Sequence, residues 1–152
     1  MTPTRAPLTC WGRWSLGWTL FVGLGAVAGT TGFWFGADYL GLTQLLPAMQ
    51  VLPLADVLFQ TTFWPGLFLL VLIGLPHLTA AGLILARRPR AWLATVLSGA
   101  ILMGWTGLQF WVFPGWFGGN PLSPAYFAFG LAEAVMACLW RRAVRPSAQV
   151  PA

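Results

Sequence analysis

Residues 65–90 read PGLFLLVLIGLPHLTAAGLILARRPR, a long apolar run that ends in a short basic turn. A bilayer has a hydrocarbon core of about 30 Å, which a helix of about 20 residues can cross. The lipid offers no hydrogen-bond partner to backbone amides and carbonyls, so an unalternating run of this length must be a helix. The run 65–86 therefore predicts a membrane-spanning helix, and the short turn at 87–90 predicts that the next helix lies antiparallel beside it.

The same kind of stretch occurs three more times along the chain. The composition, with 58% hydrophobic and 7% charged residues, leaves too little polar surface for a soluble globule of 152 residues. We expect an all-α, polytopic membrane protein with one membrane domain, residues 1–152, built as a four-transmembrane-helix bundle. The other three expected spans are residues 14–35, 91–113 and 123–140.

Every basic residue is an arginine that flanks one of these stretches. If each stretch crosses the membrane once, all eight fall on the same side, and positive charge is retained on the cytoplasmic side. Both termini are then cytoplasmic. The absence of lysine beside many Arg, Ala, Gly and Trp residues indicates a high-GC, bacterial genome, so we expect the membrane to be a bacterial inner membrane. The net charge of +5 indicates contact with lipid headgroups and not with nucleic acid. The arginines are Arg5, Arg13, Arg87, Arg88, Arg90, Arg141, Arg142 and Arg145.

The N-terminus has a second interpretation as a cleaved signal peptide. Arg5 and Arg13 form its basic region, residues 16–24 its apolar region and residues 26–28 (AVA) its cleavage site. We favour a retained span, because the apolar run continues to residue 35 and is long enough to cross the membrane. Cys10 and Cys138 are expected near the cytoplasmic face as reduced thiols, and no spacing predicts a metal site or a cofactor.

The expected outer connection, residues 36–64, is long but apolar. Leu42, Leu45, Leu46 and Met49 repeat at helical spacing, and Pro47 and Pro53 interrupt the segment. We expect a short amphipathic helical cap on the outer side of the membrane. It is either a lid that packs over the helices or a cap that gates a ligand or binds a partner. The other outer connection, residues 114–123, is rich in glycine and proline and predicts a loop.

Small residues that permit close helix contact occur on three of the spans. Two interpretations stay open: packing within the chain, or homodimerisation through the motif that runs from Gly25 to Gly29. On the first span they are Gly25, Gly29, Gly32 and Gly36; on the third, Ala100 and Gly104; on the fourth, Gly130, Ala134 and Cys138.

Two ionisable residues lie deep in the expected spans. His77 is ten residues from Arg87, and Glu133 is eight residues from Arg141. At 1.5 Å per residue both lie roughly 12–15 Å from the basic boundary, so we predict a hydrogen bond between them. Pro76 leaves one carbonyl without its helical donor and is expected to bend the second span. Gln109 lies nearer the outer boundary, where it could form a separate polar cluster.

Three interpretations of His77 and Glu133 remain open. The pair is a structural contact that fixes helix register, a proton-coupled transport or ligand site, or the acid and base of an intramembrane enzyme. No nucleophile, metal or cofactor motif supports the enzyme. We therefore expect a non-enzymatic protein that associates through its helices with itself or with a partner membrane protein. The alternative is a small transporter or a lipophilic-ligand-binding protein, with His77, Glu133 and Gln109 as candidate ligand or proton-relay residues.

The order of these features resembles the DoxX-like group of small bacterial four-helix membrane proteins, and more broadly uncharacterised small integral membrane proteins. The resemblance rests on residues 32–36 (GFWFG), the apolar loop after them, and residues 74–82 (GLPHLTAAG) before the basic turn. Members of that group commonly carry a carboxylate on the second helix, whereas here His77 occupies that region and the carboxylate, Glu133, is on the fourth span. The resemblance thus implies the fold, and not the quinone-linked redox role of some members.

Overall fold

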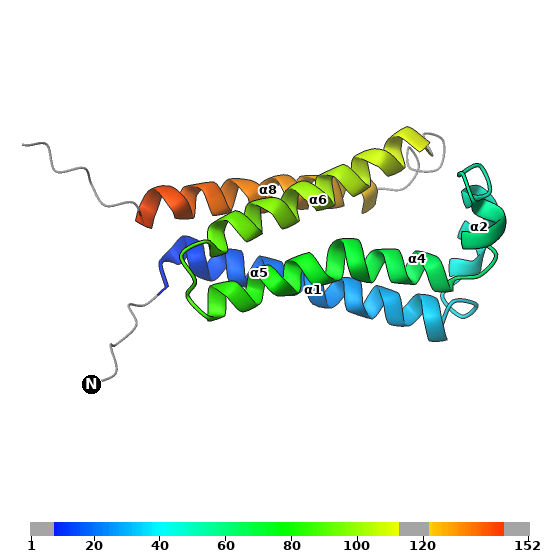
Figure 1. Cartoon of the computed structure of the whole chain (residues 1–152), viewed down its shortest axis with the longest axis horizontal. Helices are drawn as coiled ribbons and strands as arrows, with labels where there is room; N and C mark the ends of the chain where they lie inside the picture. Colours follow the sequence, from blue (N-terminus) through cyan, green and yellow to red (C-terminus); the bar gives the residue numbers. More distant parts are fainter. Residues whose placement is uncertain (1–7, 113–121, 145–152) are drawn as a thin grey trace, which may run out of the picture.

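The computed structural model describes residues 8–112 and 122–144, and every regular element within these ranges is helical (Figure 1). The predictions on Arg5, on Arg145 and on the loop at residues 114–121 lie outside the described residues. The long helical segments are α1 (Cys10–Phe35), the continuous run α4 (Phe63–Phe68), η2 (Leu69–Gly74) and α5 (Leu75–Leu85), then α6 (Ala91–Val112) and α8 (Leu122–Val144).

These segments pack as two antiparallel pairs. One pair is α6 with α8, and the other is α1 with the run from α4 to α5. We call the basic end the one where α1 begins, α5 turns into α6 and α8 ends; the opposite end is the far end. Near the basic end α5 also packs on α6, whereas toward the far end the two pairs diverge (Figure 1).

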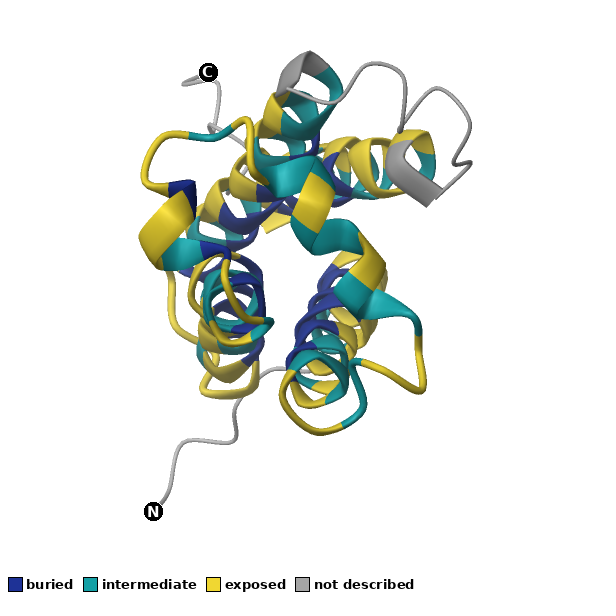
Figure 2. Ribbon diagram, turned by 90° about the vertical axis from the view of Figure 1, so that its right-hand side faces the viewer, coloured by how far each residue is buried: buried dark blue, intermediate teal, exposed yellow. Residues whose placement is uncertain are grey.

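Buried residues face the space between the helices, and exposed residues face outward (Figure 2). The outward faces are themselves apolar, with large side chains such as Phe21, Leu24, Leu97 and Val135 exposed. Three helical segments are long and apolar enough to cross a membrane: Cys10–Phe35, Phe63–Leu85 and Ala91–Phe110. A helix bundle with apolar surfaces both inside and outside is typical of membrane proteins, because lipid covers the outer surface.

Short helices form the segment between α1 and α4 at the far end (Figure 1). They are η1 (Leu42–Leu45), α2 (Leu46–Met49) and α3 (Ala55–Leu58). Pro47 lies in the first turn of α2, where a missing N–H breaks no helical bond, and Pro53 lies between α2 and α3. The predicted stripe of Leu42, Leu45, Leu46 and Met49 is half-buried.

Candidate functional site

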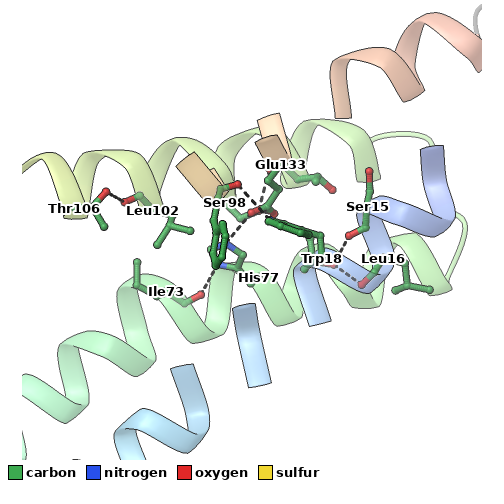
Figure 3. Close-up of polar contacts among 12 residues, drawn as sticks. Ser15, Leu16, Trp18, Ile73, His77, Ser98, Leu102, Thr106 and Glu133 are labelled. Carbon is green, nitrogen blue, oxygen red and sulfur yellow. Dashed lines mark hydrogen bonds and ion pairs between the residues drawn. The ribbon is translucent and has the colours of Figure 1, made fainter. Parts of the chain in front are cut away.

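Three polar side chains from three helices meet in the half of the molecule toward the basic end. His77 of α5 lies with its Nε2 3.0 Å from Oε2 of Glu133 on α8. The Ser98 hydroxyl of α6 donates to the other carboxylate oxygen, Oε1, at 2.7 Å (Figure 3). All three residues have 0% of their surface exposed. The structure thus brings together the two residues that the arginine spacing placed at one depth, and adds Ser98.

The contact between α6 and α8 positions Ser98 and Glu133. A Cβ atom built on Gly99 would lie 2.6 Å from the carbonyl oxygen of Gly130, and one built on Gly130 would lie 2.6 Å from that of Gly99. Only glycine fits at both positions, because the obstructing atoms belong to the backbone. The two helices therefore touch along their backbones, one residue from Ser98 and three residues from Glu133.

A change of helix type positions His77. The π-helical segment η2 directly precedes α5, and the N–H of Leu75 bonds to the carbonyl of Leu70, five residues back. Pro76 cannot donate a backbone bond, and single π-helical turns are common at functional sites. In this run the Ile73 carbonyl accepts a hydrogen bond from the His77 ring, Nδ1 to O 2.6 Å. The ring is therefore fixed at both nitrogens.

The hydrogen bonds determine where the protons are. A carbonyl oxygen only accepts, so Nδ1 of His77 carries a hydrogen and donates it to Ile73. One further proton lies in the bond between Nε2 and Glu133 Oε2. That bond joins either an imidazolium to a carboxylate or a neutral imidazole to a carboxylic acid, and the pair has zero net charge in both forms. Such a pair avoids the cost of an isolated charge in a membrane.

Other polar groups in the described residues are bonded mostly to nearby backbone. The Trp18 indole N–H donates across helices to the carbonyl of Phe129 on α8, at 3.2 Å. The Thr19 hydroxyl lies within hydrogen-bond distance of two carbonyls of its own helix. The buried hydroxyl of Ser15 has no hydrogen-bond partner. The buried polar residues therefore form one satisfied cluster, at His77, and scattered hydroxyls around it.

Gln109 lies apart from this cluster. It is half-buried near the far end of α6, eleven residues from Ser98 on the same helix, which corresponds to a rise of roughly 16 Å. The expected polar cluster around it does not form between the described residues: Gln60 is exposed, and the Thr106 hydroxyl bonds to carbonyls of its own helix.

The small residues of α1, together with Gly36 directly after its end, separate into two groups. A Cβ on Gly29 would lie 2.7 Å from Leu69 of η2, one on Gly32 would lie 3.0 Å from Leu40, and one on Gly36 would lie 3.5 Å from the Gly32 carbonyl. Gly25 has nothing within 4 Å. The motif from Gly25 to Gly29 is therefore divided between an outward and an inward face.

Sequence reasoning missed Ser98 and Gly99. The expected small face of the third span, Ala100 and Gly104, points outward: Ala100 is exposed, and Gly104 has nothing within 4 Å. A signal for Ser98 was present, since it is eight residues from Arg90, a rise of about 12 Å that matches the depth of Glu133. The sequence holds many hydroxyls, however, and spacing alone does not show which one faces the carboxylate.

Comparisons of the chain with protein-family models, with curated proteins and with solved structures found no match. Within residues 8–112 and 122–144, no group of three or more His, Cys, Asp and Glu residues is placed to hold a metal ion. The geometry of the His77 cluster is consequently the basis for any argument about function.

Proposed function

We propose that the protein is a four-span inner-membrane protein with cytoplasmic termini and a helical cap on the outer side, which acts without catalysis by associating with itself or with a partner membrane protein. In this proposal α8 is the fourth span. Its 23 residues lie along α6, and its single acid is neutralised by His77. The lipid bilayer is its solvent.

The observation that carries the proposal is the closed state of the His77 cluster. His77, Ser98 and Glu133 have no exposed surface, so no water-sized space touches them. Both ring nitrogens and both carboxylate oxygens have partners. A site that binds a substrate needs accessible, unsatisfied groups, whereas a polar contact that fixes helix register needs neither.

Outward-facing glycines support association. Gly17 and Gly25 on α1 and Gly104 on α6 are exposed, and a Cβ on any of them would meet nothing within 4 Å. Glycine against lipid gains no contact, but it lets another helix approach closely. These helix faces therefore suit a second membrane helix better than they suit lipid chains.

Cysteine crosslinking in cells tests this proposal. In a variant with Cys10 and Cys138 replaced by serine, Gly25→Cys should yield a crosslinked species of defined higher mass. The matched control is Val71→Cys, an exposed residue on η2 that is expected to stay monomeric. Monomer alone from cysteines at Gly17, Gly25 and Gly104 would contradict association through these faces.

A second candidate function, a small proton-coupled transporter or lipophilic-ligand binder, is favoured by the π-helical segment beside His77. Such segments are frequent at functional sites, and in this candidate a local change in η2 would expose the proton shared by His77 and Glu133. Reconstituted protein with Glu133→Gln should then lose pH-dependent flux or ligand binding. The control is Thr106→Val, which removes a hydroxyl that bonds only to its own helix. Absence of any such activity in the unmodified protein would eliminate this candidate.

A further inference from the structure

The basic end gathers most of the positive charge of the described residues. Arginines gather there from α1, from the turn between α5 and α6, and from the end of α8. The acids of the chain lie elsewhere: Asp38 and Asp56 are in the segment at the far end, and Glu133 is in the His77 cluster. Such a concentration of one charge attracts anions to that end.

One of these arginines contacts an aromatic ring. The guanidinium carbon of Arg141 lies 4.1 Å from the centroid of the Trp92 ring. This cation–π contact joins the last turn of α8 to the first turn of α6. The planar guanidinium carries its N–H donors in a fork that can bind two phosphate oxygens at once, and a cation–π contact consumes none of these donors.

Two more arginines adjoin this contact along the chain. Arg90 is two residues before Trp92, and its backbone is fixed because its carbonyl accepts the N–H of Ala94 at 3.3 Å. Arg142 follows Arg141. Arg90, Arg141 and Arg142 are all exposed. An anion beside Trp92 would therefore meet the Arg141 guanidinium, and Arg90 and Arg142 add two positive charges at the same end of the molecule.

We propose that Trp92, Arg90, Arg141 and Arg142 form a binding site for the phosphate headgroup of an anionic phospholipid. A lipid fits better than free phosphate because an apolar surface continues from the site. Leu93, Leu97 and Ile101 are exposed at successive turns of α6, where they can contact an acyl chain. Tryptophan also prefers the headgroup level of a membrane. The proposal rests on the membrane location of the chain, but not on its association with a partner.

Native mass spectrometry of the full-length protein in detergent tests the site. The protein is mixed with phosphatidylglycerol or phosphatidylcholine of identical acyl chains, and the fraction that retains one lipid is measured. Phosphatidylglycerol should be retained about five- to tenfold better, and high salt should reduce this preference because salt screens exposed charges. Equal retention of the two lipids would overturn the proposal.

Two variants separate an oriented site from general attraction by charge. Arg141→Lys keeps the charge but loses the planar fork, and it should lose most of the preference for the anionic lipid. Arg13→Gln removes one charge from the basic end without touching the site, and it should retain most of the preference. If Arg141→Lys behaves like the unmodified protein, or if Arg13→Gln has the larger effect, no oriented site exists.

Inorganic phosphate distinguishes the two possible sources of the phosphate group. Millimolar phosphate should leave bound phosphatidylglycerol in place, because the free ion lacks the acyl chain contact with α6. Complete displacement of the lipid by phosphate would assign the site to the free anion and would contradict the proposal. Trp92→Leu should lower the lipid preference while circular dichroism shows the same helix content as the unmodified chain.

Discussion

Polar side chains link helices in both halves of the molecule, but they link different helices in each. Toward the basic end, Glu133 of α8 bonds to His77 of α5 and to Ser98 of α6, which joins the two helix pairs to each other. Toward the far end, the Thr30 hydroxyl and the Trp34 indole donate to carbonyls of Gly66 and Phe63, both at 3.0 Å. These far bonds join α1 to α4 within one pair.

This difference accounts for the divergence of the pairs in Figure 1. In lipid, apolar side chains gain little by leaving the solvent, so helices are joined by close packing and by hydrogen bonds between them. Where such bonds cross from pair to pair, the pairs stay together. Where they remain within a pair, the pairs separate. We therefore use the name joint for the half toward the basic end, where hydrogen bonds from Glu133 link the two helix pairs to each other.

Removing the carboxylate should have the largest effect on this joint. Glu133→Ala leaves the buried Nε2 of His77 without its partner and leaves the Ser98 hydroxyl only the Thr95 carbonyl of its own helix. We expect a loss of about 3 kcal/mol in the free energy of unfolding. Unfolding in mixed micelles with rising dodecyl sulfate, followed by circular dichroism, measures it. Glu133→Gln can still bond to both partners and should lose about 1 kcal/mol. Equal losses for the two variants would show that the hydrogen bonds do not form the joint.

Widening the contact between α6 and α8 should have the next largest effect. In Gly130→Ala the new Cβ would lie 2.6 Å from the Gly99 carbonyl oxygen, so the helices must move apart. We expect a loss of about 2 kcal/mol in the same unfolding assay.

Gly104→Ala is the matched control for Gly130→Ala, because it adds the same methyl group where nothing lies within 4 Å. Its stability should change by less than about 0.5 kcal/mol. A control variant as unstable as Gly130→Ala would mean that loss of glycine itself, and not the backbone contact, causes the effect.

Removing a bond from the far half should have the smallest effect. Thr30→Val loses the hydrogen bond from α1 to the Gly66 carbonyl, a bond within one pair, and we expect a loss of about 0.6 kcal/mol. Thr106→Val loses only bonds to its own helix and should be nearly neutral. If Thr30→Val costs as much as Glu133→Ala, the two halves are held equally firmly and the comparison fails.

The depth of residues and the bounds of the helices depend on distance along a helix, and both could be predicted from the sequence. The meeting of His77 and Glu133 follows from the constant rise per residue and from the arginines that mark one boundary. The helix bounds are also close to prediction, because the length of an apolar run limits a helix in lipid: residues 65–86 were expected, and α4 to α5 span Phe63–Leu85.

Which residues face a neighbouring helix depends on rotation about the helix axis, and this was not predicted. Gly99, and not Ala100 or Gly104, meets Gly130, and Gly25 and Gly29 point to different sides. In a soluble helix the apolar stripe reveals the buried face, but in this chain the lipid face is equally apolar, so the pattern does not show which face is buried. The π-helical η2 also shifts the rotation of the residues before Pro76 relative to those after it.

The neutrality of the His77–Glu133 pair has a consequence for biogenesis. The chain is synthesised from its N-terminus, so His77 and Ser98 precede Glu133 by 56 and 35 residues. In the proposed topology, the last of the four spans to be synthesised, α8, is the one with an acid at its centre. That helix enters the bilayer after the helices that carry His77 and Ser98. Glu133 can then form its hydrogen bonds as it enters, and it does not remain in lipid as an isolated charge.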